Sequence, residues 1–288
     1  MGSVAVPEKT LEHWSSQYLS YRFKAKASLW WPSKGEDIRV TSLPRRPGKA
    51  VQIELKTTTI TAANRQDVLI DLLQLWNYLQ LPLSQQPFYA FPRPVWSGEL
   101  HSAALAAGKS VTELAYGRSG PKWWFAKWMV VLTAAEIARA LHPKFDLAVR
   151  PARKSLASLV RYEFTGRTKT ELWGPRQSLA TPPDPVDWRE FWNQLLRCGQ
   201  TKWPQLVRVP ARALPTHLPD SIPSETVLDM LADVGGPHQP IDDLVDLVPH
   251  PDGGFRLGRE RANNAPVVIE GAPDEHRQLV FLDASSMA

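Results

Sequence analysis

Glu54 and Lys56 stand two residues apart in the stretch AVQIELKTTT, which spans residues 50–59. The alternation of apolar and polar residues predicts a strand with one face toward a core, and it places Glu54 and Lys56 together on the other face. A carboxylate and an ammonium group on one strand face form either a weak ion pair in solvent or part of an active site.

Asp37 is the third residue of this candidate site. The expected strands 37–43 and 50–58 are joined by a Pro/Gly turn, and their pairing would place Asp37 opposite Leu55, next to Glu54 or Lys56. Carboxylate oxygens are the ligands that Mg²⁺ prefers, and a lysine beside them can orient a water nucleophile. Turn chemistry after Gly35 is the alternative role for Asp37.

The elements that must position these residues follow from periodicity and from the turn residues. In the first 92 residues we expect the order helix, strand, strand, strand, helix, strand, at residues 7–26, 28–31, 37–41, 50–59, 62–79 and 86–92. Further along we expect strands at 122–132 and 159–165, helices at 133–141, 186–197 and 224–234, a linker at 182–185, and two pairing strands at 266–271 and 277–283.

Asp37, followed by Glu54-Leu55-Lys56, resembles the metal-binding signature of the restriction-endonuclease-like superfamily, the PD-(D/E)XK nucleases. Gly35-Glu36-Asp37 is similar to the G-x-D turn of that family, and Gln74-x-x-x-Tyr78 resembles the Q-x-x-x-Y motif of its RecB-like exonuclease branch. Glu12-x-x-Ser15-x-x-Tyr18-Leu19 looks like its E-x-x-A-x-x-Y-L helix, although Glu8 competes with Glu12 for that role. The resemblance covers residues 8–92.

The resemblance implies an α/β fold with a restriction-endonuclease-like core, an α-β-β-β-α-β mixed sheet flanked by helices, with α+β additions. It implies a Mg²⁺-dependent nuclease, with Mn²⁺ as a substitute, that hydrolyses phosphodiester bonds in DNA, with RNA as the alternative. The implied setting is bacterial defence or mobile-DNA handling in the cytoplasm. The implied metal ligands are Glu12, Asp37 and Glu54, and the implied catalytic residues are Asp37, Glu54, Lys56, Gln74 and Tyr78. For Gln74 and Tyr78, the edge of an ordinary packing helix is the alternative.

Charge divides the chain at residue 212. Residues 213–288 carry 13 acidic and 4 basic side chains, while residues 1–212 carry 30 basic and 16 acidic side chains and all 12 Trp. We therefore expect a basic nuclease-like domain, with its core at 8–92 and additions at 93–212, and an acidic region that either covers the basic body or docks a protein partner.

Basic residues near aromatic ones are candidates for nucleic-acid binding. The candidates are Lys122, Lys127, Arg150, Arg153 and Lys154. A solvated surface is the alternative for them, and a core strand is the alternative for the Trp residues between Lys122 and Lys127. The single cysteine excludes a disulfide framework, and no signal peptide or membrane span is expected. A non-catalytic nucleic-acid-binding or protein-interaction module on a nuclease-like scaffold is the competing hypothesis.

Overall fold

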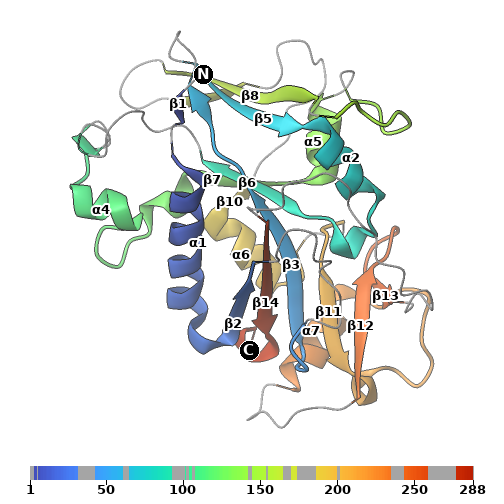
Figure 1. The fold of residues 1–288 in the computed structure, drawn as a ribbon. Coiled ribbons are helices and arrows are strands. Elements are labelled where there is room, and N and C mark those ends of the chain that lie inside the picture. Colours follow the sequence, from blue (N-terminus) through green and yellow to red (C-terminus); the bar gives the residue numbers. More distant parts are fainter. Residues whose placement is uncertain are drawn as a thin grey trace. The chain divides into compact units, whose positions relative to one another are not determined.

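The computed structural model describes residues 3–4, 6–31, 43–60, 65–92, 101, 104–105, 108–141, 145–153, 155–164, 170–173, 186–199, 202–234, 243–258 and 277–287. The chain is a mixed α/β protein in which β-sheet is flanked by helices (Figure 1). Within the described ranges, no helix combines the length and the apolar character needed to cross a membrane.

The chain divides into two units, each built from separate segments. The first unit comprises Met1–Tyr18, Glu54–Gln80 and Tyr89–Glu190, and the second comprises Leu19–Ile53, Leu81–Phe88 and Phe191–Ala288. The helix α1 (Glu8–Phe23) and the strand β3 (Gly48–Leu55) therefore each contribute residues to both units.

The first unit contains an antiparallel sheet in the order β1-β4-β5-β8-β9. These strands are Ser3–Val4, Thr59–Ile60, Arg65–Asp71, Leu156–Phe164 and Thr170–Trp173. The helix α2 (Leu72–Gln80) follows β5 directly, and α5 (Ala134–Leu141) packs against α2 and β8 (Figure 1). Because α2 starts where β5 ends, the end of this sheet fixes the position of the helix.

The rest of the first unit surrounds three more strands. These are β6 (Phe88–Pro92), β7 (Met129–Thr133) and β10 (Val186–Asp187), in the order β6-β7-β10, with β6 next to β3. The backbone N–H of Lys56 donates to Ala90 O at 2.9 Å, which ties the chain just after β3 to β6. The helix α4 (Val111–Tyr116) begins with a capping box between Ser110 and Glu113.

The second unit is built around β3. Its strands β11 (Leu206–Pro210) and β14 (Arg277–Asp283) both pair with β3, while β12 (Leu244–Pro249) and β13 (Phe255–Leu257) extend the sheet beyond β11. The strand β2 (Ala27–Trp30) pairs with β14. The helices of this unit are α6 (Trp188–Leu196), which enters it at Phe191, and α7 (Ser224–Ala232), which packs against β11.

Short 3-10 turns complete the architecture. They are η1 (Lys24–Lys26), η3 (Leu83–Gln85), η4 (Trp124–Lys127), η5 (Ala211–Ala213) and η6 (Ala284–Ser286). A core cluster beneath α7 joins apolar residues of β11, β12 and the helix itself, including Val207, Val209, Val227, Leu231 and Leu247.

The structure confirms several expected elements. The helix at 7–26, the strand at 86–92 and the helices at 133–141 and 224–234 appear as α1, β6, α5 and α7, with ends shifted by a few residues. The strand expected at 159–165 is β8, and the strand expected at 277–283 is β14. Residues 182–185 and 266–271 lie outside the described residues, and so does the expected strand 37–41.

The helix expected at 62–79 is wrong in its first half. Residues 65–71 form β5, and the helix begins at Leu72. The segment alternates with a period of two residues, since Val68 and Ile70 are buried whereas Leu69 is exposed. Its pairing with β4 and β8 overrides the helical spacing of its leucines.

The strand expected at 122–132 is also wrong in its first half. Trp124–Lys127 form the 3-10 turn η4, and β7 starts at Met129. Aromatic side chains of this turn and of Trp123 just before it pack on α1, with ring centroids 5.3 Å apart for Trp14 and Trp124 and 5.7 Å apart for Tyr18 and Trp123. Packing of large rings against a helix replaces the alternation that a strand needs.

The second unit differs from the division expected at residue 212. The acidic C-terminal residues do not form a unit of their own, because β12 pairs with β11 in an antiparallel register that sets Val207 opposite Leu247. The strand β14 pairs with β2 and β3, from the N-terminal part of the chain. Charge composition therefore did not mark a structural boundary here.

Candidate functional site

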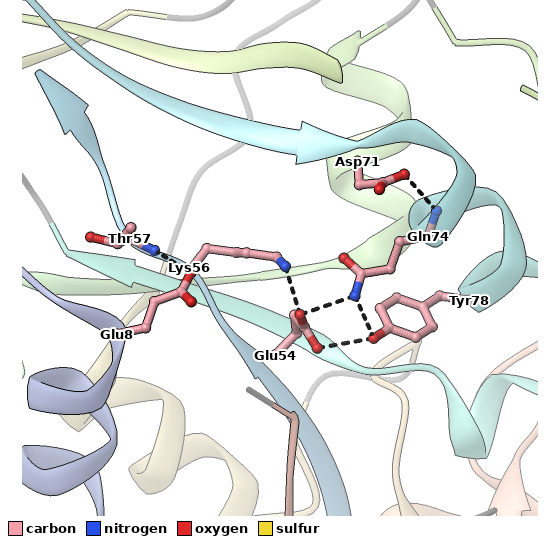
Figure 2. A network of polar contacts seen from close by, with 7 residues as sticks. All are labelled: Glu8, Glu54, Lys56, Thr57, Asp71, Gln74 and Tyr78. Carbon is pink, nitrogen blue, oxygen red and sulfur yellow. Dashed lines mark hydrogen bonds and ion pairs between the residues drawn. The ribbon is translucent and has the colours of Figure 1, made fainter. Parts of the chain in front are cut away.

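Glu54 is completely buried. All eight residues of β3 are buried, so its polar side chains do not form the solvated face that the surface-strand hypothesis requires. A buried carboxylate is costly unless charged or hydrogen-bonding groups compensate it. The structure supplies these groups to both oxygens of Glu54 (Figure 2).

Lys56 is the charged partner of Glu54. Its Nζ lies 2.7 Å from Glu54 Oε1, and its side chain is 16% exposed. Burial on its own would lower the pKa of Lys56, but the charge and hydrogen bond of Glu54, with the charges of Glu8 and Asp71, outweigh burial and raise the pKa. Lys56 is therefore held in its charged form.

Gln74 and Tyr78 bind the same carboxylate from α2. Gln74 Nε2 donates to Glu54 Oε1 at 3.1 Å and to the Tyr78 hydroxyl at 3.1 Å. The Tyr78 hydroxyl donates in turn to Glu54 Oε2 at 2.9 Å. Residues four apart lie on the same face of a helix, so the Q-x-x-x-Y spacing presents both side chains to β3. The structure thus brings Glu54, Lys56, Gln74 and Tyr78 together.

Asp71 determines where α2 begins. Its Oδ1 accepts hydrogen bonds from the backbone N–H groups of Leu73 and Gln74, at 2.9 and 3.1 Å. These are donors that a helix N-terminus leaves unsatisfied, and an Asp at this position is a preferred cap. Asp71 also contributes negative charge at Lys56. The sequence signal was an Asp immediately before an apolar helical run, and the expected longer helix concealed it.

Of the two carboxylates considered on the first helix, Glu8 is the one beside Lys56. Glu8 Oε1 accepts a hydrogen bond from the Thr57 backbone N–H at 3.1 Å, and its charge acts on Lys56. Glu12 lies one turn further along α1, where Lys9 Nζ binds its carboxylate at 3.1 Å. Figure 2 shows Glu8 next to Thr57 at the opposite end of the network from Tyr78.

The oxygen atoms of this network are of the chemical type that binds hard cations such as Mg²⁺. Gln74 Oε1 is buried and has no hydrogen-bond partner in the described part of the chain, and Figure 2 shows the Gln74 amide turned toward Lys56 and Glu54. Within the described ranges, no group of three His, Cys, Asp or Glu side chains is arranged to hold a metal ion. Asp37, the other expected ligand, lies outside those ranges.

Four of the five expected nucleic-acid-binding residues lie on the surface of the first unit. Lys122 and Lys127 are exposed, whereas Phe125 and Ala126 between them belong to the core. Arg150 and Arg153 are exposed in the segment before β8, and the Arg150 guanidinium lies 5.8 Å from the centre of the Trp76 ring. Lys154 lies outside the described residues.

Comparison with known proteins does not add to this site. No protein-family model, no curated protein and no solved structure matches the chain significantly. The chemistry of the site must therefore be argued from its own residues.

Proposed function

We propose that this protein is a metal-dependent nuclease that hydrolyses phosphodiester bonds in DNA. The observation that carries the proposal is the convergence of Gln74 and Tyr78 on the Glu54 carboxylate, which also pairs with Lys56. This convergence is what we expect if Gln74 and Tyr78 order the site, as the Q-x-x-x-Y resemblance implies. These are four of the five catalytic residues that the resemblance to PD-(D/E)XK nucleases implies, and the fifth, Asp37, lies outside the described residues.

Each residue has a role in this proposal. Glu54 and Asp37 would hold Mg²⁺ or Mn²⁺, with Gln74 Oε1 as a further oxygen donor, and the ion would supply an activated water and neutralise phosphate charge. Gln74 Nε2 and the Tyr78 hydroxyl fix the orientation of the Glu54 carboxylate. Lys56 remains charged and can stabilise the negative charge that develops on the phosphate. Glu8 takes the place of Glu12 as the helix carboxylate beside Lys56.

A second candidate is a nucleic-acid-binding module that keeps this network as a scaffold. The observation in its favour is that both oxygens of Glu54 already accept hydrogen bonds or ion pairs from Lys56, Gln74 and Tyr78. In this candidate the network serves stability, and DNA binding does not need a metal ion.

Cleavage of labelled single- and double-stranded DNA tests the proposal. The wild type, Glu54→Gln and Lys56→Met are compared with Mg²⁺, with Mn²⁺ and with EDTA. Gln keeps the shape of Glu54, which reduces the risk of unfolding. We expect metal-dependent cleavage that falls by about 100-fold or more in both variants.

Lys49→Met is the matched control. Lys49 is a buried lysine within β3, and its Nζ donates to Leu195 O at 2.6 Å near the end of α6 rather than to Glu54. Each variant is assayed at a temperature where circular dichroism shows it folded. Cleavage that survives in Glu54→Gln at the wild-type rate would overturn the proposal. DNA bound in EDTA but not cleaved with either metal would favour the scaffold candidate.

A further inference from the structure

Two neighbouring tryptophans of the second unit are held at its surface. Trp30 is 60% exposed and Trp31 is 44% exposed, although tryptophan is strongly buried on average. Trp30 is the last residue of β2, and Trp31 follows it directly. We call these two residues, with Lys24 and Lys26 of η1, the Trp30–Trp31 surface. The nuclease proposal makes no use of it.

The position of Trp30 is fixed by strand pairing. Trp30 lies opposite Leu279 in the antiparallel β2–β14 pair, and residues directly opposite each other share one face of a sheet. Leu279 belongs to a small core cluster with Leu43, Ala50, Leu206 and Phe281. Trp30 therefore lies at the rim of that cluster and presents much of its ring outward. A ring carried by a paired strand is a more rigid platform than one on a loop.

The stretch of sequence that carries these rings has charges of a single sign. Between Glu12 and Glu36 the sequence contains no acidic residue but four basic ones, Arg22, Lys24, Lys26 and Lys34. Lys24 and Lys26 are exposed, and neither forms an ion pair within the part of the chain that the structure describes. Lys26 Nζ donates to Ser285 O at 2.6 Å, a neutral partner that leaves its charge uncompensated. The charge suits a polyanion.

We propose that the Trp30–Trp31 surface binds single-stranded nucleic acid. The two rings would stack on bases, while Lys24 and Lys26 contact the phosphates. Aromatic rings beside basic side chains bind single strands because every unpaired base offers a flat face, whereas the faces in a duplex are covered by their neighbours. The proposal goes beyond the nuclease and does not rest on catalysis.

Binding is measured with the full-length protein in EDTA, which prevents metal-dependent cleavage. The probes are fluorescently labelled oligo(dT) and oligo(rU) of about 16 nucleotides, and a DNA duplex of the same length. The variants are Trp30→Ala, Trp31→Ala and the double variant Lys24→Gln with Lys26→Gln. The controls are Leu257→Ala and Arg256→Gln, an exposed apolar and an exposed basic residue on β13 of the same unit.

Each tryptophan variant should weaken single-strand binding by about tenfold, and Trp30→Phe should restore part of the loss because it keeps an aromatic face. A plot of log Kd against log salt concentration should have a slope that is smaller by about 1.4 for the double lysine variant than for the wild type, because two phosphate contacts are lost. The two controls should bind like the wild type. A stronger response to oligo(dT) or to oligo(rU) identifies the preferred strand.

The inference is overturned if both tryptophan variants bind oligo(dT) and oligo(rU) as tightly as the two controls do. It is also overturned if the wild type binds the duplex as tightly as the single strands. Cleavage that is absent from the wild type, or unchanged in Glu54→Gln, would refute the nuclease alone if the tryptophan variants still bind single strands more weakly than the two controls. Unchanged single-strand binding by both tryptophan variants would refute this inference alone.

Discussion

The Tyr78 hydroxyl donates a hydrogen bond to Glu54 Oε2 at 2.9 Å, and both side chains are completely buried. The bond joins α2 to β3 across residues that are 24 positions apart in the sequence. It requires Tyr78 to lie one helical turn after Gln74, whose amide donates to the other oxygen of Glu54. Helical geometry from Gln74 to Tyr78 is therefore what lets α2 bring both side chains to the Glu54 carboxylate.

Tyr78→Phe should destabilise the protein by about 1–3 kcal/mol, because Glu54 Oε2 and Gln74 Nε2 each lose a partner in a buried setting. The measurement is the urea midpoint followed by circular dichroism. Tyr116→Phe is the matched control, since Tyr116 is 44% exposed on α4 and should change stability by less than about 0.5 kcal/mol. Equal effects of the two substitutions would contradict the buried network.

Glu54 and Lys56 should behave as a coupled pair in a double-mutant cycle. Glu54→Gln leaves the Lys56 ammonium buried without its carboxylate, which should cost about 3–5 kcal/mol. The double variant Glu54→Gln with Lys56→Met should cost less than the sum of the single changes, because it removes both charges. Additive losses in thermal unfolding would show that the 2.7 Å pair has no energetic coupling.

The stability contributed by Lys56 should disappear at high pH. Its pKa is raised, so the folded chain holds this proton more tightly than the unfolded chain does. The stabilisation is complete below the ordinary pKa of 10.5 and is lost as the pH rises through the higher folded value. We expect the difference in Tm between wild type and Lys56→Met to be constant up to about pH 9.5 and to shrink above about pH 10.5.

Lys49 should show the opposite dependence on pH. Burial lowers the pKa of Lys49, and the nearby Cys198 offsets part of this effect. The folded chain then holds the proton less tightly, so the stability of the wild type relative to Lys49→Met should rise with pH until it passes 10.5. Differential scanning calorimetry from pH 8 to about 11 compares the wild type with Lys49→Met and with Lys56→Met. Parallel slopes for the two lysines would refute the assigned environments.

Local patterns predicted much of the fold that depends on neighbours in sequence. The periodicity of α1, α5 and α7 and the apolar run of β6 were sufficient to place them within a few residues. The convergence of Gln74 and Tyr78 with Glu54 and Lys56 also agrees with the sequence motifs. Residues four apart lie on one face of a helix wherever that helix begins. Asp37 remains a prediction, since it lies outside the described residues.

The pairing of strands that lie far apart in the sequence could not be predicted from local sequence patterns. The partners of β3 include β11 and β14, which come from more than 150 residues later in the chain, and no local signal specifies such registers. All eight residues of β3 are buried, so the alternation of polar residues around Glu54 did not mean exposure. In β5, pairing on both sides made a strand from residues whose spacing favoured a helix.

Asp71 should stabilise α2 mainly as its cap. Asp71→Ala removes the acceptor of the Leu73 and Gln74 N–H groups and should cost about 0.5–2 kcal/mol. Asp71→Asn keeps a side-chain oxygen at the same place, so it should recover most of that stability while removing a negative charge near Lys56. The readouts are the urea midpoint at pH 7 and the high-pH decline of Tm assigned to Lys56.

Asp146→Ala is the control for this prediction, because Asp146 also accepts a backbone hydrogen bond, from Ala148 at 2.9 Å, but in an exposed turn. Its substitution should change stability by less than about 0.5 kcal/mol. If Asp71→Asn were as unstable as Asp71→Ala, charge at Lys56 and not helix capping would be the main role of Asp71. In that case the high-pH decline should also move to lower pH in both variants, since Lys56 would have lost one of the charges that raise its pKa.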